Sequence, residues 1–162
     1  MLSYYGRLNY IYNDKYLATL TYRRDGSSKF AANNKWAGFL SGALAWRFSE
    51  EEFIKQSRWL SNGKLRLSYG QSGNQGISAY GSLSHITASN YPYDGVLQNG
   101  YIVSSLGNDN LKWETTSQID GGLDLGFFKE RIGLVVDYYY KRTNDLLQNV
   151  TLPSSTGYTS QV

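Results

Sequence analysis

The chain has 162 residues, enough for one ordinary domain, and its lack of cysteine excludes disulfides and thiolate chemistry. Aromatic residues make up 15% of it and Gly outnumbers Pro by 17 to 2, which suits strands and turns better than disorder. The net charge of +3 is spread along the chain, which argues against a nucleic-acid partner, and no run of 18 apolar residues predicts a transmembrane helix.

The first predicted element is a β-hairpin. Residues 4–13 and 16–24 each alternate between apolar and polar side chains across the short turn at 13–15. Pairing residue 12 with residue 16 gives one apolar face and one polar face, because side chains alternate along a strand with period two. A polar stretch at 25–35, rich in Gly, Ser and Asn, then predicts a loop.

Two further strands are predicted at 39–48 and around 65–69, with a short helix between them. Ser49 followed three residues later by Glu52 is a capping box, which predicts a helix from about Glu50 to Gln56. Residues 71–112 lack sustained periodicity and are predicted to form one long loop, a kind of segment that is often functional. The loop tyrosines could stack on sugar rings or ligand planes, or equally serve loop packing; they are Tyr80, Tyr91, Tyr93 and Tyr101.

The most regular stretch runs from 113 to 142 and predicts a second long hairpin with a turn at 128–131. Pairing residue 127 with residue 132 gives one wholly apolar face and one largely polar, charged face. Each arm supplies the roughly 9–11 residues that a tilted strand needs to cross a bilayer. The polar residues after 142 predict a final loop.

Two folds fit this alternation. A soluble antiparallel sheet buries its apolar face in a core, whereas a transmembrane barrel turns that face to lipid and its polar face to a water-filled lumen. The connections favour the barrel, because those after the first, third and fifth strands are short and those after the second, fourth and sixth are long and polar. Up-and-down strands place these two classes at opposite ends, as in outer-membrane barrels, and aromatic residues fall near the short-turn ends, where an interfacial girdle would lie.

The predicted register assigns each strand residue to one face. The charged residues predicted to face the lumen are Arg7, Arg23, Arg66, Asp120, Asp124, Asp137 and Lys141. The residues predicted to face lipid are Leu8, Leu20, Leu44, Leu67, Ile119, Leu123, Leu125, Leu134 and Val136. The basic residues could line an anion path, or be solvated or paired with Asp.

Nothing in the sequence indicates an enzyme. Asp120 and Asp124 share a face, but at about 3.3 Å per residue they stand roughly 13 Å apart, beyond the range of about 5–9.5 Å that a glycosidase pair needs. His85 is the only histidine, and without cysteine or a second histidine it predicts an exposed loop residue rather than a metal ligand. We therefore predict no catalytic residue, no metal site and no cofactor.

Seven segments of the chain, taken together in their order and spacing, are specific enough to indicate a protein family. They are 24–30 (RDGSSKF), 45–53 (AWRFSEEEF), 65–75 (LRLSYGQSGNQ), 111–116 (LKWETT), 122–128 (GLDLGFF), 137–139 (DYY) and 152–158 (LPSSTGY). Together they resemble the TonB-dependent outer-membrane transporters of the SusC/RagA type. Leu40 and Asp109 depart from that family's usual residues, both at loop edges.

The resemblance implies an all-β fold: an antiparallel up-and-down meander of about six long strands, forming a segment of a transmembrane β-barrel of about 22 strands. Residues 1–162 would be a partial barrel domain from the later part of that barrel, without a plug, a signal peptide or a closing C-terminal strand. Such a segment is expected not to transport alone.

The complete family member is expected in the bacterial outer membrane, in contact with its lipid. It would import oligosaccharides or peptides with energy from TonB and the inner-membrane proton gradient, beneath a SusD-like surface lipoprotein. A soluble β-sheet carbohydrate-binding module is the alternative of a different class. The two differ in whether the chain stays in solution without detergent.

Overall fold

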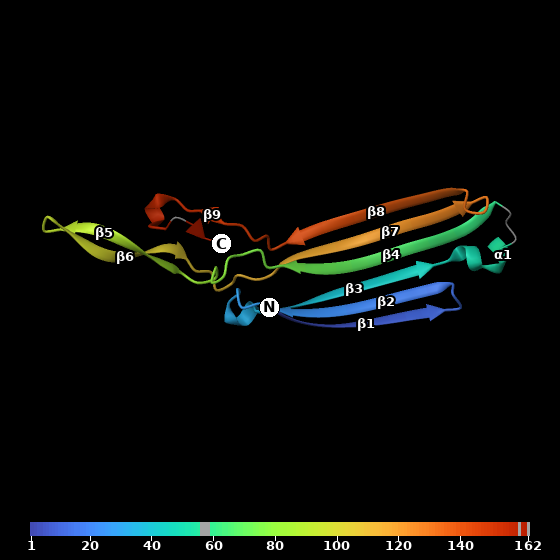
Figure 1. Ribbon diagram of the computed structural model, residues 1–162, viewed down its shortest axis with the longest axis horizontal. Coiled ribbons are helices and arrows are strands. Elements are labelled where there is room, and N and C mark those ends of the chain that lie inside the picture. Colours follow the sequence, from blue (N-terminus) through green and yellow to red (C-terminus); the bar gives the residue numbers. More distant parts are fainter. Residues whose placement is uncertain (56–58, 159, 162) are drawn as a thin grey trace.

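The main feature of the computed structural model is one open antiparallel sheet with the strand order β1-β2-β3-β4-β7-β8 (Figure 1). The model describes residues 1–55, 59–158 and 160–161. The six strands are β1 (Leu2–Tyr12), β2 (Tyr16–Gly26), β3 (Trp36–Trp46), β4 (Leu60–Asn74), β7 (Glu114–Phe127) and β8 (Ile132–Asn144). The predicted meander of six long strands is confirmed, and the sheet curves without closing into a barrel.

Both predicted hairpin registers are confirmed. Tyr12 pairs with Tyr16 in the β1–β2 hairpin, and Phe127 pairs with Ile132 in the β7–β8 hairpin. At the first turn Asn13 and Asp14 take left-handed φ values of 49° and 54°, which Asn and Asp tolerate better than most residues. Because a shift of one residue would reverse both faces, the two registers fix which side chains share a face.

The β1–β2, β3–β4 and β7–β8 connections lie at one end of the main sheet, the short-turn end, and the long connections lie at the opposite end, the loop end. The connection from β3 to β4 contains helical turns. A 3-10 turn spans Phe48–Glu50, and α1 spans only Glu52–Lys55. The short helix predicted near 50–56 therefore exists, but Ser49 lies within the 3-10 turn rather than capping a helix that starts at Glu50. The predicted last residue, Gln56, lies outside the described residues.

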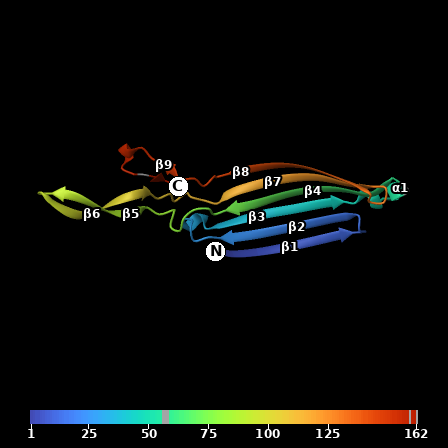
Figure 2. The ribbon, with the colours of Figure 1, turned by 45° about the horizontal axis from the view of Figure 1, so that its top comes forward.

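The prediction that 71–112 is one long loop is wrong. Strand β4 extends to Asn74, and β5 (His85–Tyr93) and β6 (Val96–Leu106) form a separate antiparallel hairpin that projects beyond the loop end of the main sheet (Figure 2). Two short strands from the final predicted loop, β9 (Val150–Thr151) and β10 (Ser160–Gln161), complete a second, four-stranded sheet of order β5-β6-β10-β9.

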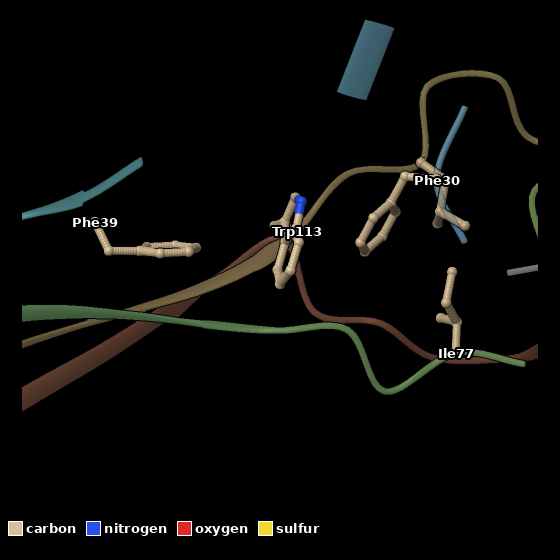
Figure 3. Close-up of a cluster of buried hydrophobic side chains, with 5 residues drawn as sticks. Phe30, Phe39, Ile77 and Trp113 are labelled. Carbon is tan, nitrogen blue, oxygen red and sulfur yellow. The ribbon is translucent and has the colours of Figure 1, made fainter. Parts of the chain in front are cut away.

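The hydrophobic core is small and lies at the loop end of the main sheet, not beneath it. Its buried members lie where the long connections leave the strands, and they are Phe30, Phe39, Ile77, Leu111 and Trp113 (Figure 3). Along the strands, by contrast, large apolar side chains remain exposed, Leu8 at 67% for example. No helix among the described residues is long and apolar enough to cross a membrane.

Candidate functional site

The polar face of the sheet is organised around Arg66 on β4. Its guanidinium donates two hydrogen bonds to Asp124 on β7, of 2.9 and 2.7 Å, and a third of 2.8 Å to Asp137 on β8. Gly122 lies between them, and a Cβ there would stand 2.6 Å from the Asp137 carboxylate and 2.7 Å from the guanidinium carbon. The bare backbone of Gly122 therefore lets Arg66 reach the next strand but one.

The remaining predicted lumen-facing charges lie on the same face but do not join this cluster. Asp120 accepts hydrogen bonds from Ser68 (3.0 Å) and Gln118 (2.6 Å). Arg7 donates to Thr21, and Arg23 to the buried Asp25 at 2.7 Å. Lys141 lies opposite Gln118 in the register of the β7–β8 hairpin. Hydrogen-bonded or ion-paired carboxylates of this kind are held in place, which favours a charged wall over a catalytic pair.

The opposite face of the sheet is apolar over most of its length. The predicted lipid-facing residues follow the observed register, with Leu8 opposite Leu20, Leu44 opposite Leu67 and Leu123 opposite Val136. Ile119 and the Leu125–Leu134 pair continue this face on β7 and β8. In a soluble protein such a face would be covered, because exposed apolar patches on monomers rarely exceed a few hundred Å².

Aromatic side chains gather at the short-turn end of the sheet. Tyr16 stacks on Trp46 with ring centroids 6.4 Å apart, and Trp46 meets Phe48 edge-on at 5.9 Å. At the same end of β7, a separate pair is formed by Trp59, which stacks on Phe127 at 5.8 Å. This grouping matches the interfacial girdle that borders the apolar band of an outer-membrane barrel.

Glu51 ties three segments together at the same end. Its carboxylate accepts hydrogen bonds from Lys15 Nζ (2.8 Å), from the Tyr16 hydroxyl (2.9 Å) and from Trp46 Nε1 (3.3 Å). The hydrogen bond from Lys15, followed by those from Tyr16 and Trp46, lowers the pKa of Glu51. The same contact with Glu51 raises the pKa of Lys15. The β1–β2 turn is thereby fastened to the helical turns that follow β3.

At the loop end, segments that are distant in sequence meet in the buried cluster. Trp113 packs between Phe30, at 5.1 Å between ring centroids, and Phe39, at 5.9 Å (Figure 3). Its indole Nε1 donates to the carbonyl of Lys35 (3.3 Å), while Lys29 Nζ donates to the carbonyl of Ile77 (2.6 Å). Lys29 Nζ also donates to the carbonyl of Gln75 at 3.4 Å, so three of the seven segments, at 24–30, 65–75 and 111–116, come together here.

The four loop tyrosines do not form one site. Tyr91 and Tyr93 share one face of the β5–β6 hairpin, while Tyr101 pairs with Ala88 on the other face. Tyr80 lies in the turn that precedes the hairpin, with a left-handed φ of 62°. The Tyr91 ring lies over Gly100, where a Cβ would stand 2.9 Å from it, whereas Tyr93 and Tyr101 are 68% and 79% exposed.

Comparison with known proteins decides the family. The model of the TonB dependent receptor-like β-barrel family matches residues 2–162. The chain belongs to this family. TonB-dependent receptor P26 of Formosa agariphila is 45% identical over 160 residues, and TonB-dependent receptor SusC of Bacteroides thetaiotaomicron is 40% identical over 167 residues. The solved structure of the RagAB peptide transporter superposes with a TM-score of 0.87 at 36% identity.

These matches cover almost the whole chain but a small part of each relative. The two curated TonB-dependent receptors are matched over 99% and 100% of this chain and over only 16% and 17% of their own lengths. For the RagAB structure the shares are 98% and 17%. TonB-dependent receptors are outer-membrane proteins, and these relatives are receptors and transporters rather than enzymes.

Sequence reasoning placed the charges and the apolar residues on their faces but missed two arrangements. It did not find the buried cluster around Trp113, because Phe30, Ile77 and Leu111 lie outside any periodic strand. It also missed the β5–β6 hairpin, although the Asp94-Gly95 dipeptide signals a two-residue turn. Both residues take left-handed φ values, 50° and 73°, as such a turn requires.

Proposed function

We propose that this chain forms part of the wall of an active outer-membrane transporter that imports oligosaccharides or peptides. One observation carries the proposal: a single curved sheet presents an exposed apolar face and, on its reverse, a face built from ion-paired and hydrogen-bonded polar residues. Such a sheet suits a wall between lipid and water. In this proposal the nine predicted lipid-facing residues contact the bilayer, and the charges around Arg66 line the lumen.

The relatives support a proposed energy source and proposed partners for the transporter. Their names as TonB-dependent receptors support uptake energised through TonB. The RagAB peptide transporter supports a peptide substrate and a second, surface subunit, for which we propose a SusD-like lipoprotein. The resemblance to the SusC/RagA type, which implies import of oligosaccharides or peptides, keeps an oligosaccharide as the second candidate substrate. The soluble binding module is not favoured, because the relatives named here are barrel proteins.

Uptake by cells producing the complete protein tests this proposal. We expect cells to accumulate either a radiolabelled oligosaccharide pool or a radiolabelled peptide pool, and a protonophore should abolish that accumulation. If these exposed rings contact substrate, the substitutions Tyr93→Ala and Tyr101→Ala should lower uptake. Losing one aromatic contact costs about 0.5–1.5 kcal/mol, which weakens substrate binding roughly two- to tenfold.

The matched control is Phe53→Ala. Phe53 is an aromatic residue of similar exposure, 75%, but it lies on α1 at the opposite end of the sheet. Its loss should leave uptake unchanged, with equal amounts of folded barrel in all strains. If neither pool enters the cells, or if uptake survives the protonophore, active transport is the wrong function.

A further inference from the structure

The apolar face of the main sheet carries an uneven set of charges. Alternation places only two charged residues of the six strands on this face, Arg24 on β2 and Arg142 on β8. Both are cations, and both lie toward the loop end of their strands. The described strands place no Asp or Glu on this face, whereas the polar face carries both signs. A wall facing neutral hydrocarbon alone would have no reason for such an imbalance.

Arg24 belongs to a small aromatic site at this end. Its guanidinium carbon lies 5.3 Å from the centroid of the Trp36 ring, a cation–π contact. Tyr4 stacks on the same ring with centroids 6.1 Å apart and planes within 18°. The ring covers Gly26, where a Cβ would stand 2.8 Å from it, so a side chain at that position would displace the platform.

A hollow of about 310 Å³ opens beside Trp36. Its lining includes Leu2, Gly26, Lys35 and Trp36, so a second cation and an aliphatic side chain border the same hollow as the ring. The hollow thus combines an apolar floor with positive charge, the two properties that a lipid with an anionic headgroup needs.

The neighbouring Arg23 has a carboxylate partner, and Arg24 differs from it in this respect. Arg23 points to the polar face and donates to the carboxylate of Asp25 at 2.7 Å. Among the described residues no carboxylate lies within ion-pairing distance of Arg24. The aromatic platform orients its planar guanidinium but leaves its N–H donors available, and such a fork matches the oxygens of a phosphate.

The position of Arg24 along the strand fits the edge of a bilayer. It lies eight residues from Tyr16 of the short-turn aromatic group, or about 26 Å along the strand at about 3.3 Å per residue. Because barrel strands tilt by about 35–45°, this length covers about 19–22 Å of height, so Arg24 lies near the outer border of an apolar band about 25 Å tall. A cation at the bilayer midplane is costly, whereas one at this border reaches the headgroups.

We propose that Arg24, held on Trp36, binds the phosphate group of a phosphorylated lipid of the outer leaflet, whose acyl chains lie along the apolar face. This inference rests on the proposed orientation of the barrel, with the long connections outside. It adds a lipid site that transport itself does not require. Lys35, which lines the hollow beside that ring, supplies a second positive charge.

Lipid binding to the complete barrel, purified in dodecyl maltoside, tests the site. The probes are phosphorylated lipid A and the same lipid after enzymatic removal of its phosphates, with bound lipid counted by native mass spectrometry. We expect Arg24→Gln to raise the dissociation constant for the phosphorylated lipid about tenfold, the size of a charge-assisted hydrogen bond, and to leave that of the dephosphorylated lipid unchanged. Raised salt should weaken only the phosphorylated probe.

The matched control is Arg7→Gln, which removes the same charge from the polar face of the adjacent strand and should leave lipid binding unchanged. All variants must migrate as folded barrels on unheated gels. Equal binding of the two lipids, no effect of Arg24→Gln, or an equal effect of Arg7→Gln would overturn the site. Displacement of the lipid by an equal concentration of inorganic phosphate would also overturn it, because the site would then take free phosphate. Since binding is measured without transport, failed uptake leaves this result intact.

Discussion

Arg66 connects two strands that are not neighbours in the sheet. It lies on β4, yet its guanidinium bonds to carboxylates on both β7 and β8. Alternation alone predicted that Arg66, Asp124 and Asp137 share a face, because each position follows from the register. It did not predict which charges pair, since that depends on side-chain reach and on the missing side chain of Gly122. At the scale of residues, faces are therefore predictable and partners are not.

Glu51 gives the first prediction, a loosening of the short-turn end in acid. Its pKa is lowered in the folded protein, so its stabilising contacts are complete above the ordinary value of 4.5 and are lost as the pH falls through the lowered value. The Arg47 amide, which donates to the Lys15 carbonyl at 2.7 Å, should then exchange its hydrogen faster, relative to its intrinsic rate, at pH 3 than at pH 7.

Two substitutions separate this effect from general acid sensitivity. Glu51→Gln should give fast exchange at Arg47 already at pH 7, with little further change in acid. Glu50→Gln removes a neighbouring carboxylate that, among the described residues, pairs with Lys55, both side chains being about half exposed, and should behave as wild type. Equal protection of Arg47 at both pH values in the unmodified protein would contradict the role given to Glu51.

The elements with regular alternation were predicted well, and those without it were not. β1, β2, β7 and β8 have one apolar and one polar face, so both their existence and their pairing follow from the sequence. The β5–β6 hairpin exposes apolar side chains on both faces, with Tyr93 on one and Tyr101 on the other, which erases the period-two signal. The turn residues Asp94 and Gly95 were therefore the remaining local evidence in the sequence for this hairpin.

Strand β8 supplies a matched test of the lipid-facing surface. Val135 and Val136 are adjacent and similarly exposed, at 60% and 53%, but they point to opposite faces. In the complete barrel Val136→Arg should lower the free energy of unfolding by about 2–4 kcal/mol if it lies near the bilayer midplane. Val135→Arg should cost far less, because it lies opposite Asp124 on the charged face. Urea unfolding in lipid vesicles measures both, and equal losses would remove the basis for the orientation.

At the scale of the whole molecule, the sheet has two free edges. β1 pairs only with β2, and β8 only with β7, so each edge presents a row of backbone N–H and C=O groups without a strand partner. In hydrocarbon each unsatisfied group costs several kcal/mol, and in water the apolar face would be uncovered. The openness of the sheet follows from its small number of strands, but its curvature and the second sheet required the structure.

We therefore expect a polypeptide of residues 1–162, produced by itself, to self-associate or to require detergent. Sedimentation in detergent-free buffer should show large species, and adding detergent should reduce their size. Lys and Glu substitutions on the apolar face of β1, such as Leu8→Lys, should improve solubility more than Ile11→Lys, which changes an exposed apolar residue on the other face. A single sharp monomer with cooperative thermal unfolding in buffer would contradict this expectation.

The buried cluster around Trp113 has a consequence for how such proteins diversify. Phe30, Ile77 and Leu111 come from three separate connections and are fixed to the sheet through Phe39. Beyond this anchorage the chain from Ser82 to Asn108 closes on itself, since the Asn108 amide donates to the Ser82 carbonyl at 3.0 Å. Insertions, deletions and substitutions in the hairpin, away from the end of β6 that pairs with β10, are therefore expected to leave the six strands of the main sheet undisturbed, so new surfaces can arise at its loop end.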